Sequence, residues 1–486
     1  MKIKIETAVK SKKGLIVFPL FQENLKKLPK NCSEKVKKFV KTQVKAKDFE
    51  GKDSEKLFTY IDDQKTLVLG AGETKKISSK IARELGAKIG KSVKAHKATE
   101  LTVVLHDDFE CFEQEILEGI LMTQYVFDTF KTLDKKKKKK ELEKINLVVS
   151  KSTKNLRKSV DHAIDIVNSV DLVKDLVNSP ANYVDSAYLA KEAKRIAKEN
   201  RYKIRIMGER ELKKLKAGGI LAVNKGCNRD PKLIVLEYRG AKSSKEKPIV
   251  LIGKGVIFDT GGYNMKPTGG METMQQDMAG AATVLGVFNT LKKLGIKKNI
   301  YGVMPVVENL VNEDAYRPSD IITMLSGKTV EVTNTDAEGR MILADALHYG
   351  SELNPDFMLT IATLTGAVSV ALGDRYCGLM GNNDDVVRKF IDAGNEVDEL
   401  AWQLPIHNDY RKKMDSEVAD FRNYDRGTGR RAGTAKAAAF LEKFINKKDW
   451  IHVDIGGTAF TTDPKPYEQK GATAHGLRMI LKMLEA

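Results

Sequence analysis

Three charged residues stand close together in the segment VEVTNTDAEGRMILADAL (330–347). A β-rich apolar run precedes Asp336, Glu338 and Arg340, and a helical pattern follows them, so we expect the charges where a strand ends and a helix begins. In an extended segment residues two apart face the same side, which places the two carboxylates together. Facing carboxylates repel each other unless a cation neutralises them. A solvated turn whose acids favour the helix N-terminus is the alternative, and this segment alone supports both equally.

A second segment, KPIVLIGKGVIFDTGGYNMKPTGG (247–270), joins an apolar strand to Lys254, Asp259, a Gly-Gly turn and Lys266. Its glycines allow the backbone to approach a ligand closely. The spacing matches neither the G-x-x-x-x-G-K phosphate loop nor G-x-G-x-x-G, so nucleotide binding is disfavoured.

A third segment, METMQQDMAGAATVLGVFNTLKKLG (271–295), carries an apolar stripe at helical spacing, bordered by Asp277 and followed by small residues. An acid at this border is costly to bury without a partner. A surface position at the edge of the stripe is the alternative.

Together the segments supply four carboxylates, a charge of −4 that two divalent cations would balance. The seven histidines form no H-E-x-x-H motif, so oxygen ligands holding Mg²⁺, Mn²⁺ or Zn²⁺ are expected. Two such ions can share a water and polarise a carbonyl. The residues therefore predict a two-metal hydrolase or a phosphoryl-transfer site and leave the substrate open.

Alternating strand and helix patterns must position these residues, and they predict an α/β fold with two domains. We expect a smaller N-terminal α/β domain at 1–153, a helical linker at 154–180 and a larger C-terminal α/β domain at 181–486, with a mixed, mainly parallel sheet flanked by helices. In the first domain the predicted strands are 14–21, 65–72, 101–107 and 145–150, and the predicted helices are 76–90 and 111–131. In the second, the predicted strands are 231–240, 247–255, 299–307, 328–334, 356–364 and 450–457.

The composition is that of a folded protein, with 42% hydrophobic and 30% charged residues and a net charge of +18. No stretch approaches 18 uninterrupted apolar residues and no secretory or transit signal fits, so we expect a cytoplasmic protein without membrane contact. The four cysteines form no C-x-x-C pair, which disfavours disulfides and thiolate zinc sites.

The basic surplus is concentrated at the N-terminal end, because residues 1–170 hold 37 Lys and Arg against 24 Asp and Glu. The run Lys135 to Lys140 is part of it. A solvated loop is the ordinary interpretation of such a run. A nucleic-acid contact is the alternative.

The sequence resembles the leucyl aminopeptidase (cytosol aminopeptidase) family in NTDAEGR, GKGVIFDTGG, MKP and DMAGAATVLG. The similarity continues in order through LVNSPANYV, ATLTGAVSVALG, GLMGN, DFRNYDRG and HVDIGGTAF, over about residues 175–475. It is much weaker in the lysine-rich N-terminal third.

The resemblance implies a metal-dependent aminopeptidase that removes leucine and other apolar residues from peptides with a free N-terminus. It implies two divalent metal ions, zinc, manganese or both, a bicarbonate, and a homohexamer. The implied metal ligands are Lys254, Asp259, Asp277, Asp336 and Glu338. The implied bicarbonate site is Gly339, Arg340 and Leu364. The implied substrate contacts are Lys266, Met274, Asp277, Thr363, Leu364, Gly366 and Ala459.

In the mechanism that the resemblance implies, a hydroxide bridging the metals attacks the peptide carbonyl, and bicarbonate held by Arg340 is the general base. Lys266 stabilises the developing oxyanion. Some bacterial members of the family also bind DNA, so a DNA-binding role of the basic N-terminal domain is a further expectation.

The chain departs from the family at Thr260, where serine is usual, at Gln275 and Ala279, where lysine and glycine are common, and at GATAHGLRMI (471–480), where GATGRPV is more usual. The last departure puts the geometry of that loop in question.

Overall fold

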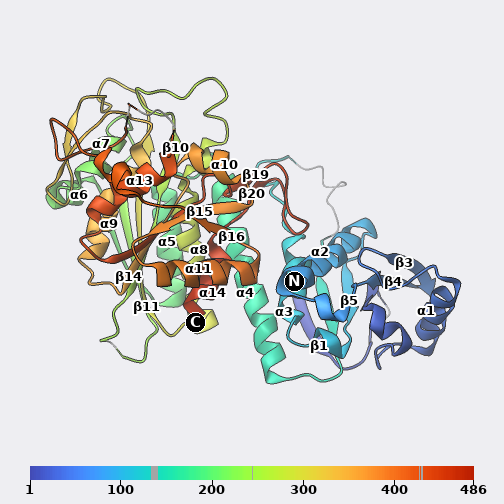
Figure 1. Cartoon of the computed structure of the whole chain (residues 1–486). Coiled ribbons are helices and arrows are strands. Elements are labelled where there is room, and N and C mark those ends of the chain that lie inside the picture. Colours follow the sequence, from blue (N-terminus) through green and yellow to red (C-terminus); the bar gives the residue numbers. More distant parts are fainter. Residues whose placement is uncertain (12, 133–140, 244, 426, 428–430, 486) are drawn as a thin grey trace. The chain divides into compact units, whose positions relative to one another are not determined.

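The computed structural model describes residues 1–485 except 12, 133–140, 244, 426 and 428–430, and the chain divides into two compact units (Figure 1). The first unit comprises Met1–Val167 and Pro464–Gln469, and the second comprises Asn168–Asp463 and Lys470–Ala486. Helix α4 (Lys154–Asn178) contributes residues to both units. The run Lys135 to Lys140 lies outside the described residues.

Within the described residues, the first unit contains a six-stranded sheet of order β1-β6-β5-β2-β4-β3. Neighbouring strands are parallel except β3 and β4. The strands are β1 (Lys2–Glu6), β2 (Leu15–Leu20), β3 (Lys56–Ile61), β4 (Gln64–Gly70), β5 (Glu100–Val104) and β6 (Lys144–Val148). The helices are α1 (Glu34–Ala46), α2 (Ser79–Ala95) and α3 (Glu113–Met122).

Glycines allow α2 and α3 to pack against each other. A Cβ atom on Gly86 would lie 2.0 Å from the Ile116 carbonyl oxygen, and one on Gly119 would lie 2.0 Å from that of Arg83. Buried Arg83 also pairs with Glu118 at 2.9 Å. On the sheet, Ile16, Phe18 and Leu20 of β2 contribute to a core cluster with residues of α1.

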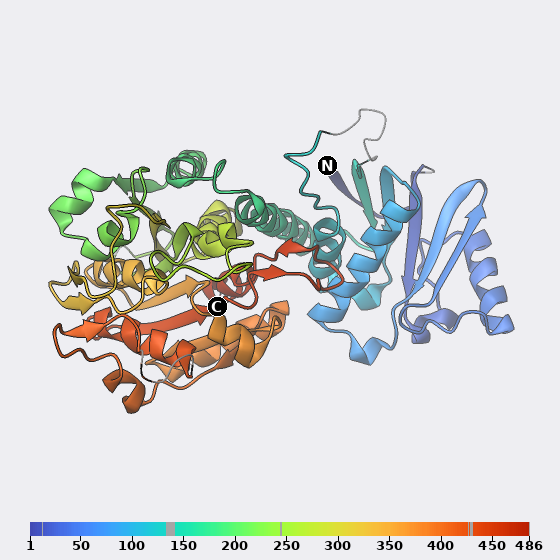
Figure 2. The ribbon, with the colours of Figure 1, turned by 90° about the horizontal axis from the view of Figure 1, so that it is seen from above.

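The second unit is built on a nine-stranded mixed sheet, counted over the described residues, of order β16-β15-β18-β14-β9-β11-β8-β7, with β10 pairing β11. The unit is coloured from green to red in Figures 1 and 2. Its central strands β18, β14, β9 and β11 run parallel. The strands are β7 (Lys203–Met207), β8 (Lys232–Arg239), β9 (Ile249–Gly253), β10 (Gly255–Asp259), β11 (Asn299–Asn309), β14 (Phe357–Ala362), β15 (Tyr376–Gly381), β16 (Leu400–Gln403) and β18 (Asp449–Asp454).

Successive strand residues point to opposite sides of this sheet, and in β9 all of them are buried. Helices therefore cover both faces. Val250 and Ile252 of β9 join a core cluster with α9 (Glu338–Ser351), α7 (Gly218–Asn224) and α13 (Gly433–Leu441). Helix α8 (Ala279–Leu294) packs on β9, β11 and β14 and contacts α5 and α14 but belongs to no part of that cluster. The remaining helices of the unit are α5 (Ser186–Asn200), α6 (Glu209–Leu215), α10 (Gly366–Leu372), α11 (Asp384–Val397), α12 (Asn408–Lys412) and α14 (Leu477–Glu485).

The predicted two-domain α/β class is confirmed, with three local corrections. The helix expected over 111–131 ends at Met122, before the β-branched and aromatic residues that follow. The helix expected over 271–295 consists of a 3₁₀ turn, η5 (Met274–Met278), and α8. The strand expected over 328–334 is β13 (Thr329–Glu331), which lies in a separate small sheet between β12 (Ile321–Thr323) and β17 (Phe421–Arg422).

Candidate active site

Lys254 is a buried cation between β9 and β10, at the carboxyl edge of the large sheet, where ligands of α/β folds usually bind. Its Nζ lies 2.7 Å from Asp277 Oδ1 and 2.9 Å from Glu338 Oε1, and it donates to the Thr363 carbonyl at 2.9 Å. The lysine fits because residue 339 has no side chain: a Cβ on Gly339 would lie 2.6 Å from Lys254 Cε.

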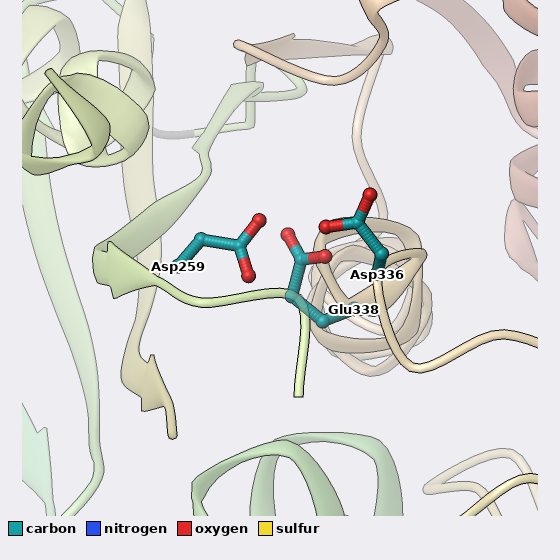
Figure 3. A group of neighbouring side chains, drawn as sticks. All are labelled: Asp259, Asp336 and Glu338. Carbon is teal, nitrogen blue, oxygen red and sulfur yellow. The ribbon is translucent and has the colours of Figure 1, made fainter. Parts of the chain in front are cut away.

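Lys266 binds the other two carboxylates of the site. Its Nζ lies 2.7 Å from Asp259 Oδ2, at the end of β10, and 2.6 Å from Asp336 Oδ1. Figure 3 shows the carboxyl groups of Asp259, Asp336 and Glu338 turned toward one another, and one ligand oxygen from each lies within 4.8 Å of the others. The structure therefore brings together all five residues of the predicted ligand set, with Lys266 beside them.

Asp336 and Glu338 reach the site from the turn before α9 and from its first residue, rather than from one extended strand. Thr335 holds this turn to the glycine loop after β10: its hydroxyl donates to the Gly261 carbonyl at 2.6 Å, and its backbone N–H donates to Asn264 Oδ1 at 2.8 Å. Local hydrogen bonds thus perform the positioning that the sequence assigned to strand geometry.

Asn309, at the end of β11, links Asp259 to the same turn. Its amide nitrogen donates to Asp259 Oδ1 at 2.8 Å and to the Thr335 carbonyl at 3.0 Å. The hydroxyl of Thr260 donates to the Asn309 carbonyl at 2.9 Å. Since a serine hydroxyl could make the same bond, the departure at Thr260 leaves this contact in place.

Asp277 is buried, so the surface position considered as its alternative is wrong. The Thr363 hydroxyl donates to its Oδ1 at 2.6 Å. Its Oδ2 is buried without a hydrogen-bond partner among the described residues. An unsatisfied buried carboxylate oxygen is costly, and a cation or a donor from a ligand would satisfy it.

The electrostatics of the cluster also favour cations. Burial raises the pKa of Asp277, Asp336 and Glu338, the charge of Asp259 raises it further, and Lys254 lowers it. For Lys254 itself burial lowers the pKa, but the surrounding carboxylates outweigh burial and raise it. Four carboxylates against two lysines leave an excess of negative charge, so the donor set fits divalent cations.

Arg340, on the first turn of α9, is buried beside this cluster. Its Nη1 donates to the Asn423 carbonyl at 2.8 Å, and its Nε has no partner in the part of the chain that the structure describes. Burial lowers the pKa of Arg340 to about 10, which still leaves it protonated at neutral pH. The free Nε is a donor that a small oxyanion could use.

The predicted substrate residues lie on three segments around these charges. Met274 begins η5, one turn before Asp277. Thr363 and Leu364 lie in the loop between β14 and α10, and Gly366 is the first residue of α10. Buried Ala459 follows β18, which pairs with β14. A Cβ on Gly366 would meet no atom within 4 Å, so there is open space beside this loop.

Comparison with known proteins agrees with this geometry. The catalytic-domain model described as "Cytosol aminopeptidase family, catalytic domain" matches residues 171–481, and the N-terminal model of the same family matches residues 16–134. The chain belongs to the cytosol aminopeptidase family.

Other members of the cytosol aminopeptidase family match most of the chain. A probable cytosol aminopeptidase of Protochlamydia amoebophila is 37% identical over 449 residues, which cover 90% of this chain and 89% of the relative. Another, of Brucella ovis, is 38% identical over 426 residues, which cover 87% and 84%. The resemblance seen in the sequence is thereby confirmed.

Two solved structures are similar over nearly the whole chain. A mutant of tomato leucine aminopeptidase has a TM-score of 0.86 at 28% identity and covers 100% of this chain and 96% of its own. The bottromycin maturation enzyme BotP, in complex with Mn, has a TM-score of 0.84 at 25% identity and covers 97% and 99%. This member of the cytosol aminopeptidase family is therefore a metal-dependent aminopeptidase that acts on peptides.

Four residues that hold the site by hydrogen bonds received no role in the sequence interpretation. They are Asn264, Asn309, Thr335 and Asn423. Asn423, which is fully buried, accepts from the Thr333 backbone N–H at 2.8 Å and donates to the Asn334 carbonyl at 2.7 Å, so it holds the residues that lead into the same turn. The one available signal was a polar residue next to a strand end, which is too common to single them out.

Proposed function

We propose that this aminopeptidase releases apolar N-terminal residues, leucine among them, from peptides, using two divalent cations of zinc, manganese or both. The cations would be held by Lys254, Asp259, Asp277, Asp336 and Glu338. When bound, such cations polarise a carbonyl and make water nucleophilic at neutral pH. The observation that carries the proposal is the cluster of four carboxylates, of which Asp259, Asp277 and Glu338 are buried, and whose negative charge two lysines only partly neutralise.

Asp277 gives the site its preference for a free N-terminus. Its buried Oδ2, which has no partner among the described residues, can accept a hydrogen bond from the substrate's α-amine. A peptide whose first amine is acetylated cannot make this contact in the same way. The enzyme should therefore cleave leucine p-nitroanilide and leave its N-acetyl derivative intact.

Lys266 stabilises the carbonyl oxygen as negative charge develops on it. Burial lowers the pKa of Lys266, but Asp259, Glu338 and Asp336 outweigh burial and raise it, so the side chain stays an ammonium donor. Arg340, with Gly339 and Leu364 beside it, would hold a bicarbonate through its free Nε and guanidinium edge. That anion suits the general-base role beside the carbonyl.

Metal removal tests the proposed chemistry directly. Thorough chelation should abolish cleavage of leucine p-nitroanilide, and Mn²⁺ or Zn²⁺ should restore it. Lys266→Ala and Arg340→Ala should still bind metal but lose about 10²–10³-fold in kcat, the usual cost of removing a group that stabilises developing charge. Activity that survives chelation would contradict the metal mechanism.

Gly366 tests the side-chain preference. Because open space surrounds this position, Gly366→Val should fold and project its side chain beside the loop that carries Thr363 and Leu364. We expect kcat/KM for leucine p-nitroanilide to fall about tenfold, the order of one clash in an apolar pocket, and that for alanine p-nitroanilide to change less. Equal losses for both substrates would place the pocket elsewhere.

The homohexamer and the cytoplasmic location stay predictions. Over the described residues, no helix combines the length and apolar character needed to cross a bilayer. The DNA-binding role also stays a prediction: Lys37, Lys38, Lys41 and Lys45 of α1 line one recess of the first unit. A gel-shift titration with duplex DNA at moderate salt tests it, and absence of binding at micromolar protein would refute it.

A further inference from the structure

Asp454, the last residue of β18, is a fully buried carboxylate. Among the described residues it accepts four hydrogen bonds, and none of them comes from a candidate metal ligand. Its Oδ1 accepts from the backbone N–H groups of Leu364 at 3.1 Å, Thr365 at 3.4 Å and Gly456 at 3.1 Å. Its Oδ2 accepts from the Thr365 hydroxyl at 2.7 Å. Three of the four donors therefore belong to the loop between β14 and α10.

The same loop touches the candidate metal site one residue earlier. The carbonyl of Thr363 accepts from Lys254 Nζ at 2.9 Å, and its hydroxyl donates to Asp277 Oδ1 at 2.6 Å. Asp454 thus holds the backbone of residues 364 and 365, and residue 363 orients two members of the ligand set. The path from the carboxylate to the site is three consecutive residues long.

The anchor beneath this loop is rigid. Strands β14 and β18 pair in parallel with Ala362 opposite Asp454, and the Ile455 N–H donates to the Ala362 carbonyl at 2.8 Å. Thr365 also shares a 2.8 Å hydrogen bond with the Thr434 hydroxyl of α13. A loop fixed at both its strand and its helix has little freedom to place Thr363 elsewhere.

The groups that donate to Asp454 are neutral. Asp454 therefore holds the loop by hydrogen bonds and not by pairing with an opposite charge. In Asp454→Asn the amide oxygen can keep the three N–H bonds. The new NH₂ group can donate to the Thr365 hydroxyl, which can turn its own hydrogen toward Thr434. Asp454→Ala removes every one of these bonds.

We propose that Asp454 is a positioning residue, which sets the β14–α10 loop so that Thr363 holds Lys254 and Asp277 in place for metal binding. The proposal rests on the two-metal function proposed above. Partners that orient metal ligands usually contribute 10–100-fold to affinity or activity, and Asp454 acts one step further out, through the loop.

The test compares Asp454→Ala and Asp454→Asn with the parent by two readouts: Mn²⁺ titration of the metal-free protein in a calorimeter, and kcat/KM for leucine p-nitroanilide. Asp454→Ala should lower Mn²⁺ affinity and kcat/KM by about 10–100-fold. Asp454→Asn should stay within about threefold of the parent in both, because it keeps the hydrogen bonds. If Asp454→Ala does not fold, Thr365→Val takes its place and should lower both readouts in the same direction.

The matched control is Glu399→Gln. Glu399 is a buried carboxylate of the same unit that accepts from the Gly476 and Met479 N–H groups at 3.0 and 3.1 Å, far along the chain from the metal ligands. The Glu399→Gln variant should have a lower melting temperature than the parent and the same Mn²⁺ affinity.

Parent-like metal binding in folded Asp454→Ala would overturn the proposal, and so would an Asp454→Asn protein as impaired as Asp454→Ala. The two proposals can fail separately. A parent that binds Mn²⁺ but cleaves no aminopeptidase substrate would refute the function, while the Mn²⁺ titrations would still decide the role of Asp454.

Discussion

Gly339 shows how closely one residue is matched to the site. A methyl group there would lie 2.6 Å from Lys254 Cε and 2.7 Å from its Nζ, closer than carbon atoms pack. We expect Gly339→Ala to displace Lys254 from Asp277 and Glu338, and to lower kcat for leucine p-nitroanilide by about 100-fold, the size of loss that a misplacement of about 1 Å can cause. Steady-state kinetics and metal content of the purified protein measure this.

The control for Gly339→Ala is Gly350→Ala in the same helix. A Cβ on Gly350 would lie 3.1 Å from the Val250 side chain and is remote from Lys254. Alanine also suits a helix interior better than glycine. This variant should keep parental kcat, and equal losses in both proteins would show that α9 as a whole, rather than the lysine, was disturbed.

The sequence predicted the charged residues of the site better than the residues that support them. The four carboxylates could be grouped because their combined charge requires cations, and the structure brings them together. The burial of Asp277 could not be predicted, because it depends on Thr363, 86 positions away. Asn309 and Asp454 carry no unusual pattern, since their importance comes only from what they contact across neighbouring strands.

At the scale of elements, the turn before α14 adopts a conformation that suits glycine. Ala474 has a φ of 61°, and this is the loop where the sequence departs from the usual family pattern. The left-handed conformation costs an alanine about 1 kcal/mol. Because relief of this strain offsets the loss of the buried Ala474 methyl group, we expect Ala474→Gly to leave the melting temperature nearly unchanged, measured by differential scanning calorimetry, with unchanged activity.

Ala472→Gly, two residues earlier in the short strand β20 (Gly471–Ala472), is the matched control. The φ angle of Ala472 is not positive, so glycine relieves no strain there. The substitution adds freedom to the unfolded chain and removes a buried methyl group, and both effects destabilise the fold. It should lower the melting temperature. An equal decrease for Ala474→Gly would argue against strain at this turn.

Helix α4 carries a half-buried acid that should make stability depend on pH. Burial raises the pKa of Asp171 to about 7, with Lys174 lowering and Asp175 raising it. The folded chain then keeps this proton up to about pH 7, whereas the unfolded chain releases it near pH 4. Stability should therefore fall as pH rises from about 4 to 7 and level off above, by at most about 4 kcal/mol.

Asp171→Asn removes this titration. Its melting temperature should match the parent's near pH 4 and exceed it increasingly up to about pH 7. Asp161→Asn, at an exposed position of the same helix, is the control. The difference between its melting temperature and the parent's should stay constant over this pH range. A constant difference for Asp171→Asn across the same pH range would count against the raised pKa.

Elements with a long, uniform pattern were predictable, and those fixed by distant contacts were not. The 25-residue helix α4 and the apolar central strands were expected close to their observed bounds. Short β13 was assigned to the main sheet because its sequence is β-rich, but its partners β12 and β17 place it apart. The partner β17 lies about 90 positions further along the chain, too far for a local pattern to indicate the pairing.

At the scale of the whole molecule, each unit has its own sheet and hydrophobic core, and the candidate metal ligands all belong to the second unit. The net basic charge, by contrast, is concentrated in residues 1–170. Sequence alone indicated this division of composition. The separate cores add a thermodynamic consequence, because a ligand stabilises only the part of the molecule that binds it.

Metal should therefore raise the stability of one unit selectively. We expect two thermal transitions in the metal-free protein, and only one of them should shift upward when Mn²⁺ is added. An ion present at 100 times its dissociation constant contributes about 2.7 kcal/mol per site, enough to move a transition by several degrees. Gly339→Ala, with its damaged ligand set, should lose most of that shift, which assigns the responsive transition to the second unit. If the protein instead showed a single transition that shifted with Mn²⁺, the two units would unfold as one cooperative body, and the separation of their cores would have no energetic counterpart.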